Sequence, residues 1–288
     1  MQVEVKNLTY VYSESSKALA NKALDNVSLT IEEGDFLGII GHTGSGKTTF
    51  VQHLNGLIKV GKNKGSITVG EFSLGDKKCD FKKLRSKVGM VFQYPEHQLF
   101  AETVLDDVAF SLKNFEPNLT EEEKTERVKE ALSLVGLDIE KVKDKSPFEL
   151  SGGQKRRVAI AGVIVSRPEV LVLDEPVAGL DPVGKKEFLK LLHQLHQSFV
   201  KTIIIVSHDM DVVAEHCNKT AVFSHGKICA VGTPKEIFSN YAQIEELGLE
   251  LPTTAKLVKR LKENGIEIDC DLTVKDFVRA ITDKGVGL

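Results

Sequence analysis

Gly41-His42-Thr43-Gly44-Ser45-Gly46-Lys47-Thr48 is the stretch that decides the fold, because it matches the pattern G-x-x-x-x-G-K-[ST] at every position. Residues 36–40 before it predict a short buried strand, and residues 49–57 after it predict a helix, which is the order of elements that this motif requires. The glycines let backbone N–H groups turn inward around phosphate oxygens, and the helix adds the positive end of its dipole. The stretch therefore predicts a phosphate-binding P-loop; the alternative is a glycine-rich turn without a ligand.

The polar residues at the end of this loop carry the expected chemistry. Lys47 is placed to reach the outer phosphates of a nucleotide, and the Thr48 hydroxyl is placed to hold Mg²⁺. The predicted nucleotide-binding set is the eight residues of the loop together with Thr49 and, upstream, Tyr12. Tyr12 ends an alternating stretch, where an aromatic ring can stack on adenine; the alternative is that it only covers a sheet.

The composition is that of an ordinary soluble chain. Its 288 residues include 38 basic and 41 acidic side chains, a net charge of -3, so no overall field attracts nucleic acid or an anionic membrane. The longest apolar runs are far shorter than the ~20 residues of a spanning helix, and the polar N-terminus is not a signal peptide, so we expect a cytosolic protein. The four cysteines have no C-x-x-C pair and no histidine at ligand spacing, which predicts reduced thiols without a metal.

The segments around the loop predict a mixed α/β fold. Alternating residues 3–12 and 27–31 flank a polar loop over residues 13–22, and this pattern predicts an antiparallel N-terminal sheet. Further strands are predicted over residues 66–69, 88–92, 170–174, 203–206, 221–223 and 227–231.

A helical block interrupts the alternation of strands and helices. Residues 103–114 and 120–135 predict two helices, and Thr120 with Glu123 forms the capping-box pattern at the start of the second. Because the flanking segments alternate strand and helix, we expect a helical insertion, about residues 94–167, in an α/β core.

Leu150-Ser151-Gly152-Gly153-Gln154 precedes a predicted helix over residues 155–165, so its two glycines would present bare N–H groups to an anion. The apolar strand over residues 170–174 ends in two adjacent carboxylates, Asp174 and Glu175. The carboxyl end of a buried parallel strand is where chemistry is expected. We expect Asp174 to bind Mg²⁺ and Glu175 to polarise a water against the γ-phosphate. The alternative is that both acids only cap a turn.

A third polar group follows the next predicted strand. His208 comes directly after residues 203–206. A histidine after a strand is usually only a loop residue, but this one converges on the same crevice as Asp174 and Glu175. We therefore expect His208 to hydrogen-bond the γ-phosphate and orient the attacking water.

Beyond about residue 238 the pattern changes. Residues 240–251 predict a polar connector, and residues 253–263 and 273–282 each predict a short amphipathic helix. Two such helices cannot bury much surface alone, so we expect them to lie on the main domain or on a partner. The predicted division is a catalytic domain over residues 1–239 and a C-terminal helical extension over residues 240–288, a candidate dimer contact.

Together these motifs resemble the ATP-binding cassette (ABC) family over roughly residues 1–239, in the family's own order. The resemblance implies an α/β fold, with a P-loop NTPase core, an N-terminal antiparallel β subdomain, a helical insertion subdomain and a small C-terminal two-helix extension. It implies ATP hydrolysis with Mg²⁺. The implied roles are Walker A loop for Gly41 to Thr48, Q-loop glutamine and magnesium ligand for Gln93, signature for Leu150 to Gln154, catalytic base for Glu175, D-loop for Asp181 and switch histidine for His208.

In this family two cassettes meet head to tail. Residues 151–154 of one chain would then face the γ-phosphate held by Lys47 of the other. This arrangement agrees with electrostatics, since a second helix N-terminus can neutralise the far side of the triphosphate. The implied partner is a second ABC ATPase subunit, either a paralogue or another copy of the same chain.

Finer features resemble the ATPases of energy-coupling factor transporters, and more closely the second of their two paralogous ATPases. These features are residues 41–44, 95–100 and 145–150 and the two-helix tail. The resemblance implies a peripheral protein on the cytoplasmic face of the cell membrane, which powers import of a vitamin or a transition-metal ion. The implied partners are a second ATPase, a transmembrane coupling subunit and a substrate-binding membrane subunit. Thr48-Thr49 stands where the family more often has Ser-Thr, and this departure keeps a hydroxyl for Mg²⁺.

Leu99 and Phe100 are apolar residues in an otherwise polar loop and are the candidate contact with a membrane subunit. The alternative is that they pack into their own helical insertion. Two other functions stay open. A soluble ABC ATPase acting on DNA or the ribosome fits less well, because the chain has one cassette, no basic arm and no room for a long coiled coil before the signature. The other is the ATPase of a different transporter class, such as an importer with a periplasmic receptor or an exporter.

Overall fold

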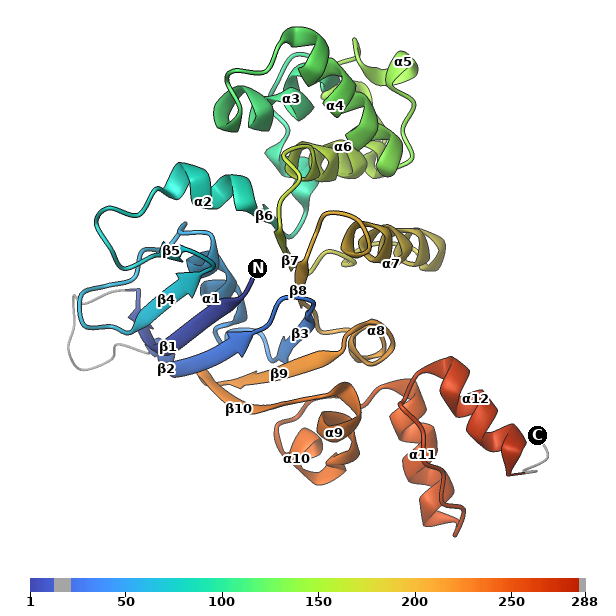
Figure 1. Cartoon of the computed structure of the whole chain (residues 1–288). Coiled ribbons are helices and arrows are strands. Elements are labelled where there is room, and N and C mark those ends of the chain that lie inside the picture. Colours follow the sequence, from blue (N-terminus) through green and yellow to red (C-terminus); the bar gives the residue numbers. More distant parts are fainter. Residues whose placement is uncertain (13–21, 285–288) are drawn as a thin grey trace.

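The computed structural model describes residues 1–12 and 22–284. Within this part, a sheet with the strand order β10-β9-β3-β8-β7-β6 forms the centre of the molecule (Figure 1). β9, β3, β8, β7 and β6 run parallel, and β10 pairs with β9 as the antiparallel hairpin that the sequence predicts. The strands are β3 Phe36–Gly41, β6 Val88–Val91, β7 Val170–Asp174, β8 Thr202–Val206, β9 Lys219–Ser224 and β10 Lys227–Gly232.

The central strands are apolar on both faces because both faces are covered. Along β7, Leu171 and Leu173 pack in a core cluster with the helical insertion, whereas Val170 and Val172 pack in a second cluster with the N-terminal sheet. This alternation follows from the two-residue period of a strand. The polar residues of these strands accordingly come at their ends.

The second sheet is the predicted N-terminal antiparallel sheet, with the order β2-β1-β4-β5. Val3 and Val5 of β1 are 1% and 2% exposed, as their alternation with polar residues predicts. The predicted polar loop over residues 13–22 falls outside the described residues up to residue 21, and Lys22 already begins β2. The strands are β1 Val3–Val11, β2 Lys22–Ile31, β4 Ser66–Val69 and β5 Phe72–Ser73.

The helical insertion between β6 and β7 is the lobe at the top of Figure 1. Thr120 and Glu123 form the predicted capping box at the start of α4. The helix predicted from residue 155 begins earlier, at Gly152, because Ser151 caps it. The elements of this lobe are α3 Val104–Phe115, α4 Glu121–Leu134, α5 Ile139–Val142, α6 Gly152–Ile164 and the 3₁₀ turns η1 Pro95–Gln98 and η2 Pro147–Glu149.

Further helices flank the parallel sheet, and the sequence predicted them only in part. The helix after the P-loop begins at Lys47, inside the motif, and ends at Leu54, before the predicted end at residue 57. Two helices of seven residues each were not predicted, because so short a segment shows no clear apolar period. The flanking helices are α1 Lys47–Leu54, α2 Phe81–Lys87, α7 Pro182–His196 and α8 Met210–His216.

The C-terminal extension, residues 240–284 of the described part, packs on its own chain. The connector predicted over residues 240–251 was wrong in part, because Asn240 caps a further helix there. Apolar residues of the extension, including Ile244, share a core cluster with Ile40 of β3. The C-terminal helices are α9 Pro234–Ser239, α10 Tyr241–Glu246, α11 Thr253–Glu263 and α12 Val274–Asp283.

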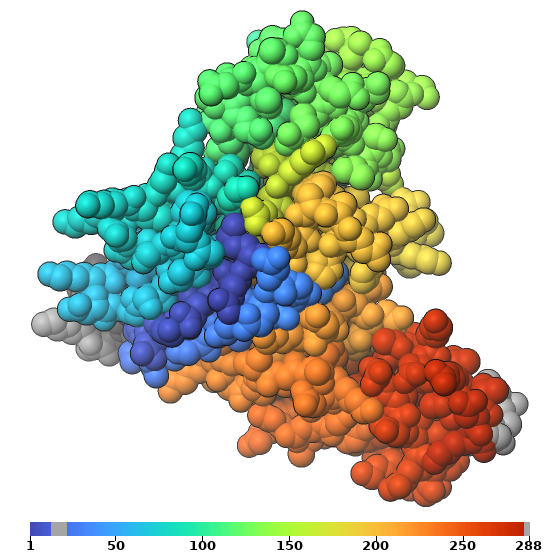
Figure 2. Space-filling model, viewed as in Figure 1, coloured from blue at the N-terminus to red at the C-terminus, as the bar shows by residue number. Residues whose placement is uncertain are grey.

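Figure 2 shows the extension as a lobe at the lower right, away from the helical insertion at the top. Among the described residues, every helix is too short or too polar to serve as a membrane span.

Candidate active site

The polar strand ends predicted from the sequence meet at one edge of the parallel sheet. The P-loop follows β3, His208 follows β8, Asp174 ends β7 and Gln93 lies beyond β6, and these four strands are neighbours in that order. They surround a cavity of about 550 Å³, which we call the strand-end pocket. Its lining residues are Tyr12, Lys22, Ala23, Thr43, Gly44, Gly46, Lys47, Thr48, Thr49, Gln93, Asp174, Glu175, Val206 and His208.

The P-loop can form only with glycine at two of its positions. Gly41 and Gly46 have φ angles of 147° and 102°, and a Cβ atom would lie 2.2 Å from the Phe223 carbonyl oxygen at the first and 2.3 Å from the Ala23 carbonyl oxygen at the second. The backbone therefore passes directly against its neighbours. This close packing fixes the course of the loop around the N-terminus of α1.

Lys47 places a buried cation at the floor of the strand-end pocket. Its residue is 8% exposed, and its Nζ donates hydrogen bonds to the carbonyl oxygens of Gly41 at 2.6 Å and His42 at 2.8 Å. Burial lowers the pKa of the ammonium, and the nearby carboxylates of Glu175 and Asp174 oppose that shift. A buried ammonium held by neutral carbonyls is a site for an anion such as a phosphate.

Asp174 has the properties of a metal ligand, because one of its carboxylate oxygens is buried and unpaired. It is 4% exposed, and burial raises the pKa of its carboxyl, while the Thr48 hydroxyl and the Lys47 charge act in the opposite direction. Its Oδ1 atom is buried with no hydrogen-bond partner in the structure. A carboxylate oxygen left unsatisfied beside a threonine hydroxyl fits Mg²⁺, which is bound through oxygen atoms.

Glu175 and His208 also line the strand-end pocket. Nδ1 of His208 lies 2.7 Å from Oε2 of Glu175, although the two groups are not angled to form a hydrogen bond. Glu175 has a φ angle of 50°, which is unfavourable for a residue with a side chain, and its N–H donates to the Val206 carbonyl oxygen at 3.0 Å. Backbone strain of this kind is found at sites that orient a reactive side chain.

Tyr12 lies at the mouth of the pocket. Its hydroxyl is 2.9 Å from the Thr49 hydroxyl, its ring packs edge-on against Tyr10, and the residue is 63% exposed. The ring is therefore fixed at one end and open to a ligand over much of its surface. Stacking on adenine stays a prediction.

Residues 24–178 match the family model described as ABC transporter, which is more than half of the chain. The chain belongs to this family. Among its relatives, the energy-coupling factor transporter ATP-binding protein EcfA2 of Clostridioides difficile is 50% identical over 273 residues, which cover 94% of this chain and 93% of that protein. The protein of the same name from Bacillus licheniformis is 49% identical over 265 residues, covering 91% of this chain and 90% of that protein.

Solved structures agree with this assignment. The structure of cbiO1 from Clostridium perfringens, part of the ABC transporter complex cbiONQ, has a TM-score of 0.72 and 39% identity, covering 89% of this chain and 98% of that chain. A dimeric post-hydrolysis state of the ATP-binding cassette MJ0796, bound to ADP and Pi, has a TM-score of 0.71 and 30% identity, covering 81% of this chain and 98% of that chain. The predicted ABC fold is confirmed, and the chain is an ABC ATPase of the energy-coupling factor type.

The signature and the D-loop of this ABC ATPase lie outside the strand-end pocket. Gly153 and Asp181 instead line a second cavity, of about 490 Å³, between the helical insertion and α7. Ser151 and Gln154 cap α6 reciprocally, and a Cβ atom on Gly152 or Gly153 would meet nothing within 4 Å. Asp181 accepts a hydrogen bond from the Gly184 N–H at 2.7 Å and caps α7.

The predicted contact of Leu99 with a membrane subunit was wrong for its side chain. Leu99 is 6% exposed and belongs to the core cluster of the helical insertion, so the alternative prediction holds for this residue. Phe100 is 59% exposed and packs edge-on against Phe110, itself 48% exposed, with their ring centres 4.9 Å apart. The apolar surface at this place is therefore the Phe100–Phe110 pair.

Sequence reasoning missed Arg156, which hydrogen-bonds to the backbone at the start of the D-loop. Arg156 is 7% exposed, and its guanidinium donates to the Ala178 carbonyl oxygen at 3.0 Å and to the Pro176 carbonyl oxygen. Burial lowers its pKa, against the opposing charge of Glu96. The available signal was the basic run Lys155-Arg156-Arg157 before the apolar part of α6. Lys22 and Ala23 line the strand-end pocket without any such signal.

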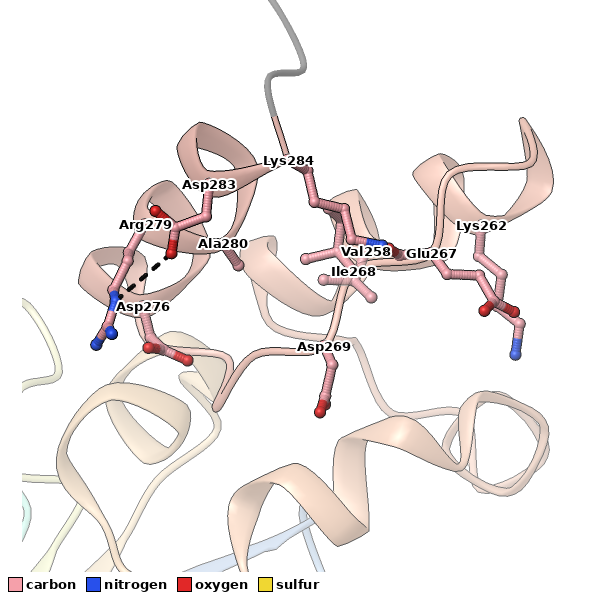
Figure 3. A pocket seen from close by; sticks show the side chains of 10 residues that line it. All are labelled: Val258, Lys262, Glu267, Ile268, Asp269, Asp276, Arg279, Ala280, Asp283 and Lys284. Atoms are coloured by element: carbon pink, nitrogen blue, oxygen red, sulfur yellow. Dashed lines mark hydrogen bonds and ion pairs between the residues drawn. The ribbon is translucent and has the colours of Figure 1, made fainter.

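A larger cavity lies elsewhere, in the C-terminal extension (Figure 3). Its volume is about 680 Å³, and its rim mixes basic residues such as Arg279 with acidic residues such as Asp276 and Asp283. It contains none of the residues of the strand-end pocket. The chemistry of the molecule is therefore assigned to the smaller pocket.

Proposed function

We propose that the chain is the ATP-hydrolysing subunit of an energy-coupling factor importer, bound peripherally to the cytoplasmic face of the cell membrane. Partner membrane subunits would carry out the uptake of a vitamin or a transition-metal ion. The observation that carries this proposal is the similarity to energy-coupling factor ATP-binding proteins, which reaches 50% identity over 94% of the chain. The complete set of strand-end residues in one pocket supports it.

In this proposal the triphosphate of ATP is bound by the N–H groups of residues 41–48 and by Lys47, with Tyr12 against the adenine. Thr48, Asp174 and Gln93 would hold Mg²⁺, which would supply charge neutralisation and orientation for the phosphates. Glu175 accepts the proton of the attacking water. The buried Lys47 ammonium and the unsatisfied Asp174 oxygen support these roles.

A second ABC ATPase subunit completes the site in this proposal. The N-terminus of α6, over Ser151, Gly152, Gly153 and Gln154, would face the triphosphate held by the partner. The solvent exposure of Ser151 and both glycines supports this role, as do the dimeric cassette structures among the relatives. We favour a paralogous partner over a second copy, in which case the isolated chain hydrolyses ATP only slowly.

Two apolar surfaces are candidate contacts with partners. The Phe100–Phe110 pair would dock a coupling segment of the transmembrane subunit. Val274 and Val278 of α12 are 60% and 53% exposed, one helical turn apart, and would contribute to a dimer contact of the C-terminal extension.

The test is purification of the tagged full-length chain from detergent-solubilised membranes, with identification of the bound chains by mass spectrometry. We expect a second ABC ATPase, a multi-span membrane protein and a small membrane-embedded binding protein. Recovery with ribosomes or nucleic acid in a salt-sensitive complex, without membrane proteins, would overturn the proposal.

Replacement of the exposed ring tests the docking surface. Phe100→Asp is expected to reduce recovery of the membrane subunits at least several-fold, because it places a charge in an apolar contact. The control is Leu57→Asp, which changes an exposed apolar residue, 48% accessible, that follows α1 rather than lying in the helical insertion. Equal recovery with Phe100→Asp and wild-type protein would remove this surface from the interface.

A further inference from the structure

The P-loop is hydrogen-bonded directly to the C-terminal extension through the side chain of His42. Nε2 of His42 lies 2.5 Å from the carbonyl oxygen of Leu247, which is 205 positions later in the chain. A carbonyl oxygen only accepts hydrogen bonds, so the ring nitrogen is the donor and Nε2 carries the hydrogen. This contact joins the nucleotide-binding loop to the end of α10.

The end of α10 is shaped to receive this ring. The N–H of Gly248 donates to the Glu245 carbonyl and the N–H of Leu249 to the Ile244 carbonyl, which is the Schellman pattern of a helix end. Gly248 has a φ angle of 64°, and a Cβ atom there would lie 3.0 Å from Nε2 of His42. Glycine at this position thus allows both the turn and the approach of the imidazole.

The backbone of His42 is bonded to the phosphate-binding lysine. The His42 carbonyl oxygen accepts from Nζ of Lys47 at 2.8 Å and from the N–H of Ser45 at 3.1 Å. One residue therefore contacts the extension with its ring and the interior of the P-loop with its carbonyl. A shift of α10 would move the carbonyl that holds the lysine.

An apolar contact lies beside this polar one. Ile40, the penultimate residue of β3, is fully buried in a cluster with Ile244 of α10 and Phe238 of α9. The strand that leads into the P-loop and the extension therefore share one core. Because such a core does not deform freely, the position of α10 is fixed relative to residue 42.

We propose that His42 is a positioning residue through which the C-terminal extension holds the P-loop in its phosphate-binding form. The extension thereby increases the affinity of the chain for nucleotide, because a loop that is already ordered loses less conformational freedom on binding. By linkage, a bound nucleotide stabilises the end of α10 to the same degree. A surface far from the triphosphate thus responds to the state of the pocket.

The first test compares two replacements of the ring in the purified full-length chain. His42→Leu removes the donor, whereas His42→Gln keeps an N–H donor at a similar reach. We expect the dissociation constant of a non-hydrolysable ATP analogue with Mg²⁺, measured by calorimetry, to rise about threefold to tenfold for the leucine variant. The glutamine variant should recover most of this loss. Equal affinities of the leucine variant and wild type, or equal losses in both variants, would overturn the proposal.

The second test leaves His42 in place and alters Gly248, the residue after its acceptor Leu247. Gly248→Ala is expected to weaken nucleotide binding, since the new methyl group crowds Nε2. Gly265→Ala is the matched control, because Gly265 ends α11 in the same Schellman pattern, has a φ angle of 79° and has nothing within 4 Å of its Cβ position. Both substitutions strain the backbone, but only the first touches the P-loop. Equal affinity losses in the two variants would assign the effect to strain alone and refute the proposal.

The third test observes the contact itself in the wild-type protein. In a nitrogen-15 spectrum of the imidazole rings, assigned with the leucine variant, His42 should carry hydrogen on Nε2, and its signal should shift when the nucleotide analogue is added. Amide hydrogen exchange at Leu247 to Leu249 should slow in the same titration. In the complete transporter, the leucine variant should raise KM more than it lowers kcat. A His42 ring without hydrogen on Nε2, or exchange unaffected by nucleotide, would contradict the coupling.

Discussion

Two helices of this molecule have glycine at their N-terminal ends, α1 at its cap position and α6 at its first two residues, and these two ends are built in opposite ways. α1 begins at Lys47, which is buried in the strand-end pocket, and the residue at its cap position, Gly46, provides no side-chain cap. α6 starts after Ser151, which forms a full capping box with Gln154, and its glycines are exposed. Both helix ends direct partial positive charge outward. They differ in what satisfies the N–H groups.

This difference indicates which end forms a binding site within one chain. A buried helix end without a cap leaves donors that need an external acceptor, so α1 is ready for an anion. A capped and exposed end is stable by itself and can be reached by a second molecule. In the proposed function, the chain thus holds one phosphate cradle of its own and one that would serve another subunit. The following predictions test this division.

The largest effect on turnover is expected in the strand-end pocket. Glu175→Gln removes the proposed base but keeps the size of the side chain, so turnover in the complete transporter should fall by roughly 10²–10⁴-fold while ATP binding persists. Phosphate release measures turnover. Light scattering with ATP should show the ATPase pair held in its closed, dimeric form. Glu126→Gln, an exposed change on α4, is the control. Wild-type turnover in the Glu175 variant would remove this residue from the base role.

A smaller effect on turnover is expected at the exposed N-terminus of α6. Nucleotide binding by the isolated chain should not change. Gly153→Asp places a carboxylate where the partner's triphosphate is expected, so turnover in the complete transporter should fall by roughly 10²–10³-fold. The isolated chain should bind the nucleotide analogue as before, because α6 is outside the strand-end pocket. Gly75→Asp is matched, since Gly75 is exposed and its Cβ position is also open. Weakened binding by the isolated Gly153 variant would contradict the division between the two helix ends.

The sequence predicts the strand-end pocket better than it predicts the contacts made by exposed loops and by the C-terminal extension. Walker A loop, strand ends and both sheets follow from local patterns, because strand period and glycine requirements act within a few residues. Leu99 was misjudged, because a polar loop can hide one residue that fits a core built from distant helices. The contact of His42 with Leu247 was likewise invisible, since it depends on how α10 packs against β3.

The smallest effect concerns the stability of the folded chain when a buried residue of the strand-end pocket is replaced. Because burial raises the pKa of Asp174, the folded chain holds that proton more tightly than the unfolded chain, and ionisation lowers stability as the pH rises past the unfolded value. Asp174→Asn should therefore raise the Tm of the nucleotide-free chain at pH 7, by about 2–4 °C for about 1 kcal/mol, although it removes a proposed magnesium ligand. Thermal unfolding followed by circular dichroism should show this gain shrinking as the pH falls toward the range where Asp174 is protonated.

Asp138→Asn is the control for this gain. Asp138 caps α5 at the surface, where Lys141 lowers the pKa of its carboxyl, and asparagine caps a helix about as well as aspartate. No stabilisation is expected there, because the exposed carboxylate has a favourable neighbour and no burial cost. If Asp174→Asn instead lowered the Tm at pH 7, then Thr48 and Lys47 would outweigh burial even without a nucleotide. The pocket would in that case be satisfied by its own residues, as the capped end of α6 is, and the contrast between the two helix ends would fail.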